Sequence, residues 1–152
     1  EDSNNLLATT NSTIKNNLKT WLNEYKMIND TVDILDARIV NIGINFSLKI
    51  HHAADKFSVL ERCITTLKTK YKQHFYLGEP FYISGVYSTL NRVPGVVDVI
   101  DVEVVAKNSA NYSSYTFNIE DNLSPEGRYI ATPQNVILEI KFPDQDIRGT
   151  IK

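Results

Sequence analysis

The sequence predicts a small α+β fold, because the spacing of its apolar residues changes several times along the chain. Helical spacing occurs in three segments, and alternating or nearly continuous apolar runs typical of strands occur in three others. The predicted order is helix, strand, helix, helix, strand, a long connection and a closing strand. We expect a small sheet of about three main strands packed by two or three helices.

The chain begins with a polar, asparagine-rich segment over residues 1–11, which we expect to be a flexible arm. A helix is expected from about Thr13, with Asn11 or Ser12 as its N-cap. The turn at Asn29-Asp30 is expected to end it. Its apolar residues form a single stripe: Ile14, Leu18, Trp21, Leu22 and Tyr25.

A strand is predicted over residues 42–50, where apolar and polar residues alternate with a period of two. Residues 34–40 are apolar with less order, so we expect a bulge or bend between the two halves. Residues 12–152 are expected to form a single domain. Because the first residue is Glu1 rather than methionine, we expect the chain to be a fragment of a longer one.

Two further helices are predicted in the middle of the chain. Asp55 is expected to cap the first, whose apolar stripe consists of Leu60, Ile64, Leu67 and Tyr71. Gly78 is expected to stop this helix, and Pro80 suits the first turn of the next. The second helix is short, has the stripe Ile83, Val86 and Leu90, and is expected to end before Pro94.

The remaining strands are predicted over residues 97–106 and 136–142, and we expect them to pair antiparallel. Between them lies a connection at about 107–133 that is rich in asparagine, serine and tyrosine. This connection is too long for an ordinary hairpin. We therefore expect it to be either functional or ordered against another part of the protein.

The composition excludes several classes of protein. Hydrophobic residues at 42% and charged residues at 22% are ordinary for a globular chain. The net charge of −2 and scattered lysines and arginines predict no nucleic-acid partner. No apolar run reaches the roughly 18–20 residues needed to cross a bilayer, so no membrane partner is predicted. Cys63 has no second cysteine to pair with, and we expect a buried, inert thiol.

Candidate catalytic and metal-binding residues are few. His51 and His52 are adjacent on a strand and would face opposite sides, and the other soft ligands are only Cys63 and His74. The carboxylates lie at strand ends or on solvent-facing positions: Asp33, Asp36, Asp98, Asp101 and Glu103. Glycines are dispersed rather than clustered in a phosphate-binding loop. We expect no enzyme, cofactor, metal or small-molecule substrate.

Aromatic residues are the candidate protein contacts. The connection holds Tyr112, Tyr115 and Tyr129 among serines and asparagines, a mixture typical of recognition surfaces. These rings either bind a partner or cover an edge of the sheet. Trp21 and Tyr25 on the first helix have the same two interpretations, packing on their own core or on a partner chain.

Two alternatives to assembly stay open. A secreted or surface module that binds protein or carbohydrate is suggested by the tyrosines and by N-x-S/T triplets at Asn11, Asn29, Asn45, Asn111 and Asn122. A chain this rich in asparagine, serine and threonine also makes such triplets by chance, which we favour. A small enzyme using Asp98, Asp101 or His51 is the other alternative.

Four segments carry a resemblance to a known family: LKTWLNEYKMINDTVDILDARIVNIGINFSLKI, LERCITTLKTKYKQHF, LGEPFYISGVYSTLNRV and PGVVDVIDV. Their order over about Leu18 to Val105 resembles the baseplate J-like family, which includes wedge proteins of the inner ring of T-even-type contractile-tailed phages. Residues 136–142 fit its closing strand. The resemblance implies a structural virion protein of the tail baseplate, assembled in the bacterial host cytoplasm. It also implies self-association and binding to other wedge proteins, with no catalytic residue.

Overall fold

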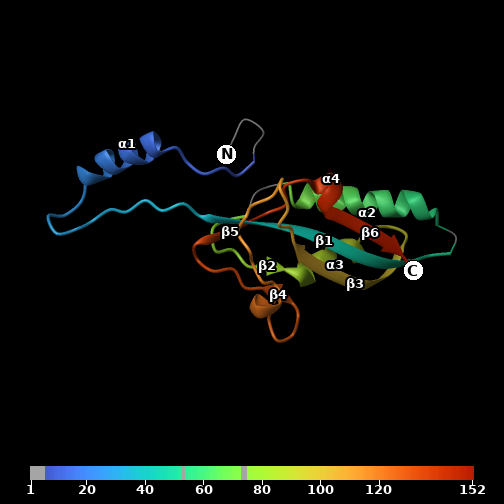
Figure 1. The fold of residues 1–152 in the computed structure, drawn as a ribbon. Coiled ribbons are helices and arrows are strands. Elements are labelled where there is room, and N and C mark those ends of the chain that lie inside the picture. Colours follow the sequence, from blue (N-terminus) through green and yellow to red (C-terminus); the bar gives the residue numbers. More distant parts are fainter. Residues whose placement is uncertain (1–5, 53, 73–74) are drawn as a thin grey trace.

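The computed structural model describes residues 6–52, 54–72 and 75–152 and has an α+β fold, which confirms the predicted class (Figure 1). The central element is strand β1 (Arg38–Ile50). Strand β3 (Val96–Ala106) pairs antiparallel with β1 along one side. On the other side β1 pairs in parallel with two short strands, first β5 (Val136–Glu139) and then β6 (Ile147–Ile151).

This topology corrects one prediction. The strands predicted over residues 97–106 and 136–142 do not pair with each other, because β1 lies between them. The second of these ends at Glu139, and the short helix α4 (Pro143–Asp146) then leads the chain into β6. Strand β6 was not predicted, since IRGTI is short and contains a glycine and a charge.

Two helices cover one face of the sheet. Helix α2 (Lys56–Lys70) packs against β6, helix α3 (Ile83–Asn91) packs against β3, and the helices contact each other. Asp55 caps α2 as predicted, since its Oδ2 accepts a hydrogen bond of 3.0 Å from the Ser58 N–H. The predicted stripe of α3 is fully buried: Ile83, Val86 and Leu90.

The segment between these helices differs from the prediction. Helix α2 ends at Lys70, so Gly78 does not stop it. Gly78 lies in a later turn with a φ of 70°, a backbone conformation that is strained for residues with a side chain. Pro80 precedes the short strand β2 (Phe81–Tyr82) rather than opening α3.

The core lies between the sheet and these helices. Alternate residues of β1 face it: Val40, Ile42, Ile44, Phe46 and Leu48. The intervening residues Asn41 and Gly43 are also buried, because residues 107–115 cover the other face at this end. Strand β1 is continuous from Arg38, so the expected bulge in it is wrong. The register shifts lie in its pairing with β3, opposite Ser47/Leu48 and Lys49/Ile50.

The long connection at 107–133 is ordered on the domain. It contains a 3-10 turn (Glu120–Asn122) and strand β4 (Tyr129–Ile130), which pairs antiparallel with β2. Helix α1 (Ser12–Asn23) has Asn11, one of the two predicted residues, as its N-cap. It ends at Asn23, so the Asn29-Asp30 turn does not end it as expected. Figure 1 shows α1 and the extended chain that follows it projecting from the domain.

Candidate protein interface

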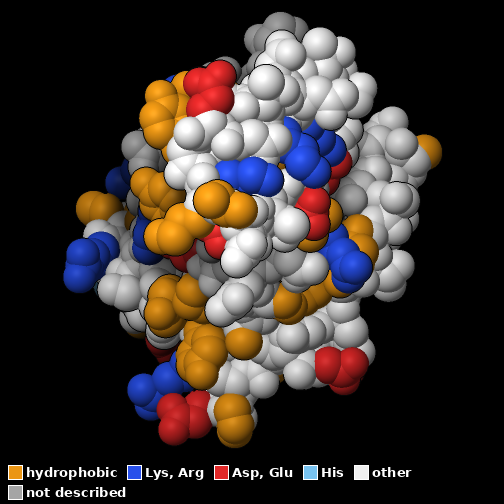
Figure 2. All heavy atoms as spheres, turned by 90° about the vertical axis from the view of Figure 1, so that its left-hand side faces the viewer, with side chains coloured by type: hydrophobic (Ala, Val, Ile, Leu, Met, Phe, Trp, Pro, Cys, Tyr) orange, Lys and Arg blue, Asp and Glu red, His pale blue; other side chains and the backbone are white. Residues whose placement is uncertain are grey.

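Residues 12–37, which comprise α1 and the chain that leads into β1, are called the arm from here on; residues 1–11 are not part of it. The arm exposes many large apolar side chains. Helix α1 has no buried residue, although it is amphipathic. In a monomer an amphipathic helix normally buries its apolar stripe. The large exposed apolar side chains of the arm are Ile14, Leu18, Trp21, Tyr25, Met27, Ile28 and Leu35. Figure 2 shows this side of the molecule, where orange side chains gather between separate charged groups.

The candidate residues Trp21 and Tyr25 lie on this arm. Trp21 is 54% exposed and Tyr25 is 72% exposed. Their ring centres are 5.0 Å apart and the ring planes are tilted by 53°, so the two rings contact each other on the surface of the arm. Among the residues that the sequence singled out, this pair remains available to a partner.

Ion pairs fold the arm back on itself. Lys15 on α1 pairs with Asp36, and Lys19 pairs with Asp33 at 3.3 Å, so the helix lies beside the chain that leads into β1. The hydrogen bond from Lys15 lowers the pKa of Asp36 below its usual value. The arm therefore has a defined shape even though its apolar side chains have no cover.

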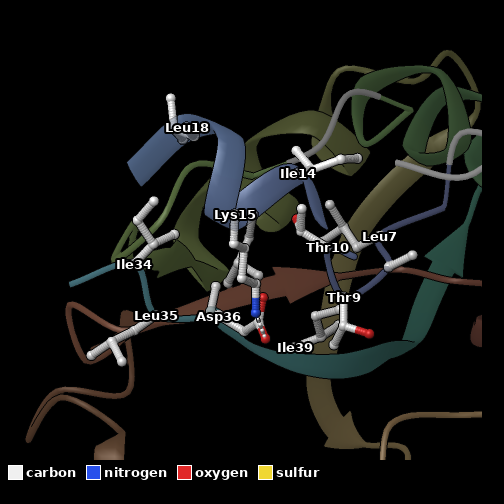
Figure 3. Close-up of a pocket in the computed structure, with 13 residues that line it drawn as sticks. Leu7, Thr9, Thr10, Ile14, Lys15, Leu18, Ile34, Leu35, Asp36 and Ile39 are labelled. Atoms are coloured by element: carbon white, nitrogen blue, oxygen red, sulfur yellow. Dashed lines mark hydrogen bonds and ion pairs between the residues drawn. The ribbon is translucent and has the colours of Figure 1, made fainter. Parts of the chain in front are cut away.

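An apolar pocket of about 240 Å³ lies inside this fold (Figure 3). Its walls come from four segments: Leu7 to Thr10, the first turns of α1, Ile34 to Ala37, and Ile39 with Ile137. Figure 3 shows the Lys15 and Asp36 side chains pointing toward each other between α1 and the chain below it. The pocket is bordered by this charge pair, and the rest of its lining is mostly apolar, with Thr9 and Thr10 as the other polar residues.

The tyrosines of the connection have internal roles. The Tyr112 hydroxyl donates to Asp146 Oδ1 at 2.5 Å, and its ring packs edge-on against Phe142 at 5.4 Å. Desolvation and this hydrogen bond raise the pKa of Tyr112 to about 12. The Tyr115 hydroxyl accepts from Arg38 at 3.2 Å, and the same guanidinium lies 5.0 Å from its ring centre. These contacts hold the connection on the sheet.

Tyr129 is placed differently. It lies on β4, is 40% exposed, and its ring is 6.0 Å from that of Tyr82 on the paired strand. The two rings form a small exposed aromatic pair on the two-stranded sheet, well separated in sequence from the arm.

A buried polar network went unrecognised in the sequence. Asn41 on β1 and Glu139 on β5 are 2% and 3% exposed and directly paired. Asn41 Nδ2 donates to Glu139 Oε2, and the Leu7 N–H donates to Glu139 Oε1, both at 2.7 Å. Asn41 Oδ1 accepts from the Ser113 N–H at 2.7 Å. The sequence signal for this network was one polar residue within each of two apolar runs, Asn41 in the first and Glu139 in the second.

The candidate metal ligands do not come together in the described part of the chain. His51 and His52 are exposed neighbours with ring centres 4.5 Å apart, and His74 lies outside the described residues. Within residues 6–52, 54–72 and 75–152, no group of three or more histidine, cysteine or acidic side chains could hold a metal ion. Cys63 is buried, as predicted, and desolvation raises its pKa to about 11.

No helix in the described part of the chain has both the length and the apolarity needed to cross a bilayer. Comparison with protein-family models and with curated proteins finds no match for this chain. The candidate interface therefore rests on the arm itself.

Proposed function

We propose that this chain is a structural subunit of the tail baseplate of a contractile-tailed phage, assembled in the bacterial host cytoplasm. It binds other wedge subunits and further copies of itself and catalyses no reaction. The exposed apolar side chains of the arm carry this proposal, because contiguous apolar patches of this kind mark interaction surfaces. The element order that resembles the baseplate J-like family supports the same class.

The arm is suited to this task by its order before binding. Asn11 already caps the first turn of α1, so the helix is formed before a partner binds. Trp21 and Tyr25 are the expected anchors, since tryptophan and tyrosine dominate the energetics of protein interfaces. Tyr112 and Tyr115 are poorer candidates because their hydroxyls are used inside the domain.

Sedimentation velocity tests the arm in about 1 M salt, where contacts between exposed charges are screened. The wild-type chain should associate as its concentration rises, and the double variant Trp21→Ser with Ile28→Ser should not. Phe57→Ser is the matched control, since Phe57 is 83% exposed on α2, away from the arm. A wild-type chain that stays monomeric, or an equal loss in the control, would refute association through the arm.

A carbohydrate-binding module is the second candidate, supported by the exposed Tyr82 and Tyr129 rings, which could stack on a sugar. Binding to a glycan array that is lost on Tyr129→Ala and kept in the Trp21→Ser, Ile28→Ser variant would favour it. Absence of glycan binding in the wild-type chain would remove it.

A further inference from the structure

The sheet has a second face whose outer half is open. Strands β3, β1 and β6 lie side by side, and one face carries the apolar residues that meet α2 and α3. Residues 107–115 cover the other face only near Asn41 and Gly43. Beyond Gly43 this face holds a hollow of about 320 Å³, and we call the residues around it the open face: Asn45, Ser47, Asp101, Glu103, Arg148, Thr150 and Lys152.

Charge on the open face is separated by strand. The register places Glu103, Asn45 and Arg148 in one row and Asp101, Ser47 and Thr150 in the next, with Lys152 at the end of β6. Acidic side chains therefore line β3 and basic side chains line β6, and the exposed Lys49 lies on the same face on the central strand β1. Two strand spacings, roughly 9–10 Å, separate the two lines. None of the four charged residues forms an ion pair within the described chain.

Ser47 lies on β1 at the centre of this face, midway between the acidic and basic lines. The residue is 7% exposed, and its hydroxyl is covered by the chain itself.

We propose that a second copy of this chain packs on the open face, related by a two-fold axis parallel to β1. This rotation places β3 of each copy over β6 of the other, so that Glu103 faces Arg148 of the second copy. A two-fold axis perpendicular to the strands would instead place acidic residues over acidic residues, which charge repulsion opposes. The charge pattern thus favours a second copy in this orientation, because the pairing of acidic with basic strands outweighs the one like-charge contact between the two Lys49 side chains on the axis.

The open face is formed by a few residues on each of three strands, so we expect an interface smaller than the roughly 800 Å² per partner of a standard stable one. Its contacts are mostly between charges at a polar surface. We therefore expect a weak dimer that dissociates as salt rises, because the Debye length falls from about 10 Å at 0.1 M to about 3 Å at 1 M salt. Association through the apolar arm should not weaken in this way.

Charge exchange provides the test, carried out in the Trp21→Ser, Ile28→Ser chain so that arm contacts play no part. Sedimentation at low salt should show the mean mass rising toward twice 17.3 kDa with concentration and returning to the monomer near 1 M salt. An acid-reversed variant, Asp101→Lys with Glu103→Lys, and a base-reversed variant, Arg148→Glu with Lys152→Glu, should each be monomeric. Mixing the two in equal amounts should restore the dimer.

The matched control for the acid-reversed variant is Glu61→Lys with Glu126→Lys, which raises the net charge by the same amount at exposed positions away from the open face. This control should dimerise like its parent. A parent chain that is monomeric at low salt, a mixture that stays monomeric, or a control that also dissociates would each overturn the proposal. Thermal unfolding of every variant shows whether it is folded. If the high-salt experiment refutes association through the arm, the result expected of this low-salt experiment stays the same.

Discussion

Asn41 and Glu139 face each other across the parallel pair β1–β5, and the Asn41 amide donates to the Glu139 carboxylate at 2.7 Å. The same carboxylate accepts from the Leu7 N–H, and the same asparagine accepts from the Ser113 N–H. One buried pair thereby joins the N-terminal segment, two strands and the long connection.

Replacing Glu139 with alanine should destabilise the protein by about 1–3 kcal/mol or more, because two buried donors lose their acceptor. Urea unfolding followed by circular dichroism measures this loss. Glu61→Ala is the control, since an exposed carboxylate on α2 should change stability by no more than about 0.5 kcal/mol. Equal effects of the two substitutions would contradict a structural role for the network.

Tyr112→Phe should loosen the long connection, because Asp146, which is 1% exposed, loses the hydroxyl donor to its Oδ1. The Phe142 N–H still donates to Asp146 Oδ2 at 2.8 Å, so we expect a loss of about 1–2 kcal/mol rather than unfolding. Hydrogen exchange should rise in residues 107–115 while that of α3 changes little. Uniform exchange across the chain would argue against this local anchor.

Stability should fall at alkaline pH. The pKa values of Cys63, Tyr71 and Tyr112 are raised to about 11, 12 and 12, and burial is the first cause for each. Each group is neutral when protonated, so the unfolded chain releases these protons at lower pH than the folded chain. The stabilisation is complete below about pH 9 and is lost as pH rises toward 11 to 12. Denaturant midpoints across this range should decrease less in Tyr71→Phe; an unchanged slope would contradict the assignment.

Gly149→Ala should destabilise the fold by about 1–3 kcal/mol, because an added Cβ would meet the Phe46 ring and would lie 2.6 Å from Leu60 Cδ1. Gly127 is the comparison: an added Cβ there has no neighbour within 4 Å, and its φ of 67° alone opposes substitution. Thermal unfolding of Gly149→Ala and Gly127→Ala separates crowding from backbone strain. A larger loss in Gly127→Ala would contradict the packing of β6 against α2.

Cys63 should resist thiol reagents in the folded protein, since it is fully buried and desolvation keeps its thiol protonated. Labelling should become fast only at denaturant concentrations that unfold the chain, and a colorimetric thiol assay measures its rate. Rapid labelling in native buffer would show that α2 opens locally.

Much of the fold was predictable because its signals are local. The stripe of α3, the Asp55 cap and the Asn11 cap depend on neighbours within a few residues, and the structure has each of them. Strand β6 was missed because its five residues are ordered by pairing with β1 and by packing under α2, not by their own pattern. The roles of Tyr112 and Tyr115 were equally hidden, since their partners Asp146 and Arg38 lie 34 and 77 residues away.

The sequence by itself determined the α+β class, the N-caps of α1 and α2, the buried stripe of α3 and the buried thiol, because each follows from composition and short-range spacing. The stripe predicted for α2 was wrong in part: the helix buries Val59, Cys63 and Leu67, whereas Leu60 and Ile64 are half-buried. Only the tertiary structure decided which strands pair, which tyrosines are used internally and which apolar stripe has no cover. Trp21 and Leu67 both lie on apolar helix stripes, yet one is 54% exposed and the other is fully buried. That difference depends on whether a sheet lies beside the helix, and the strands of that sheet come from residues distant in sequence.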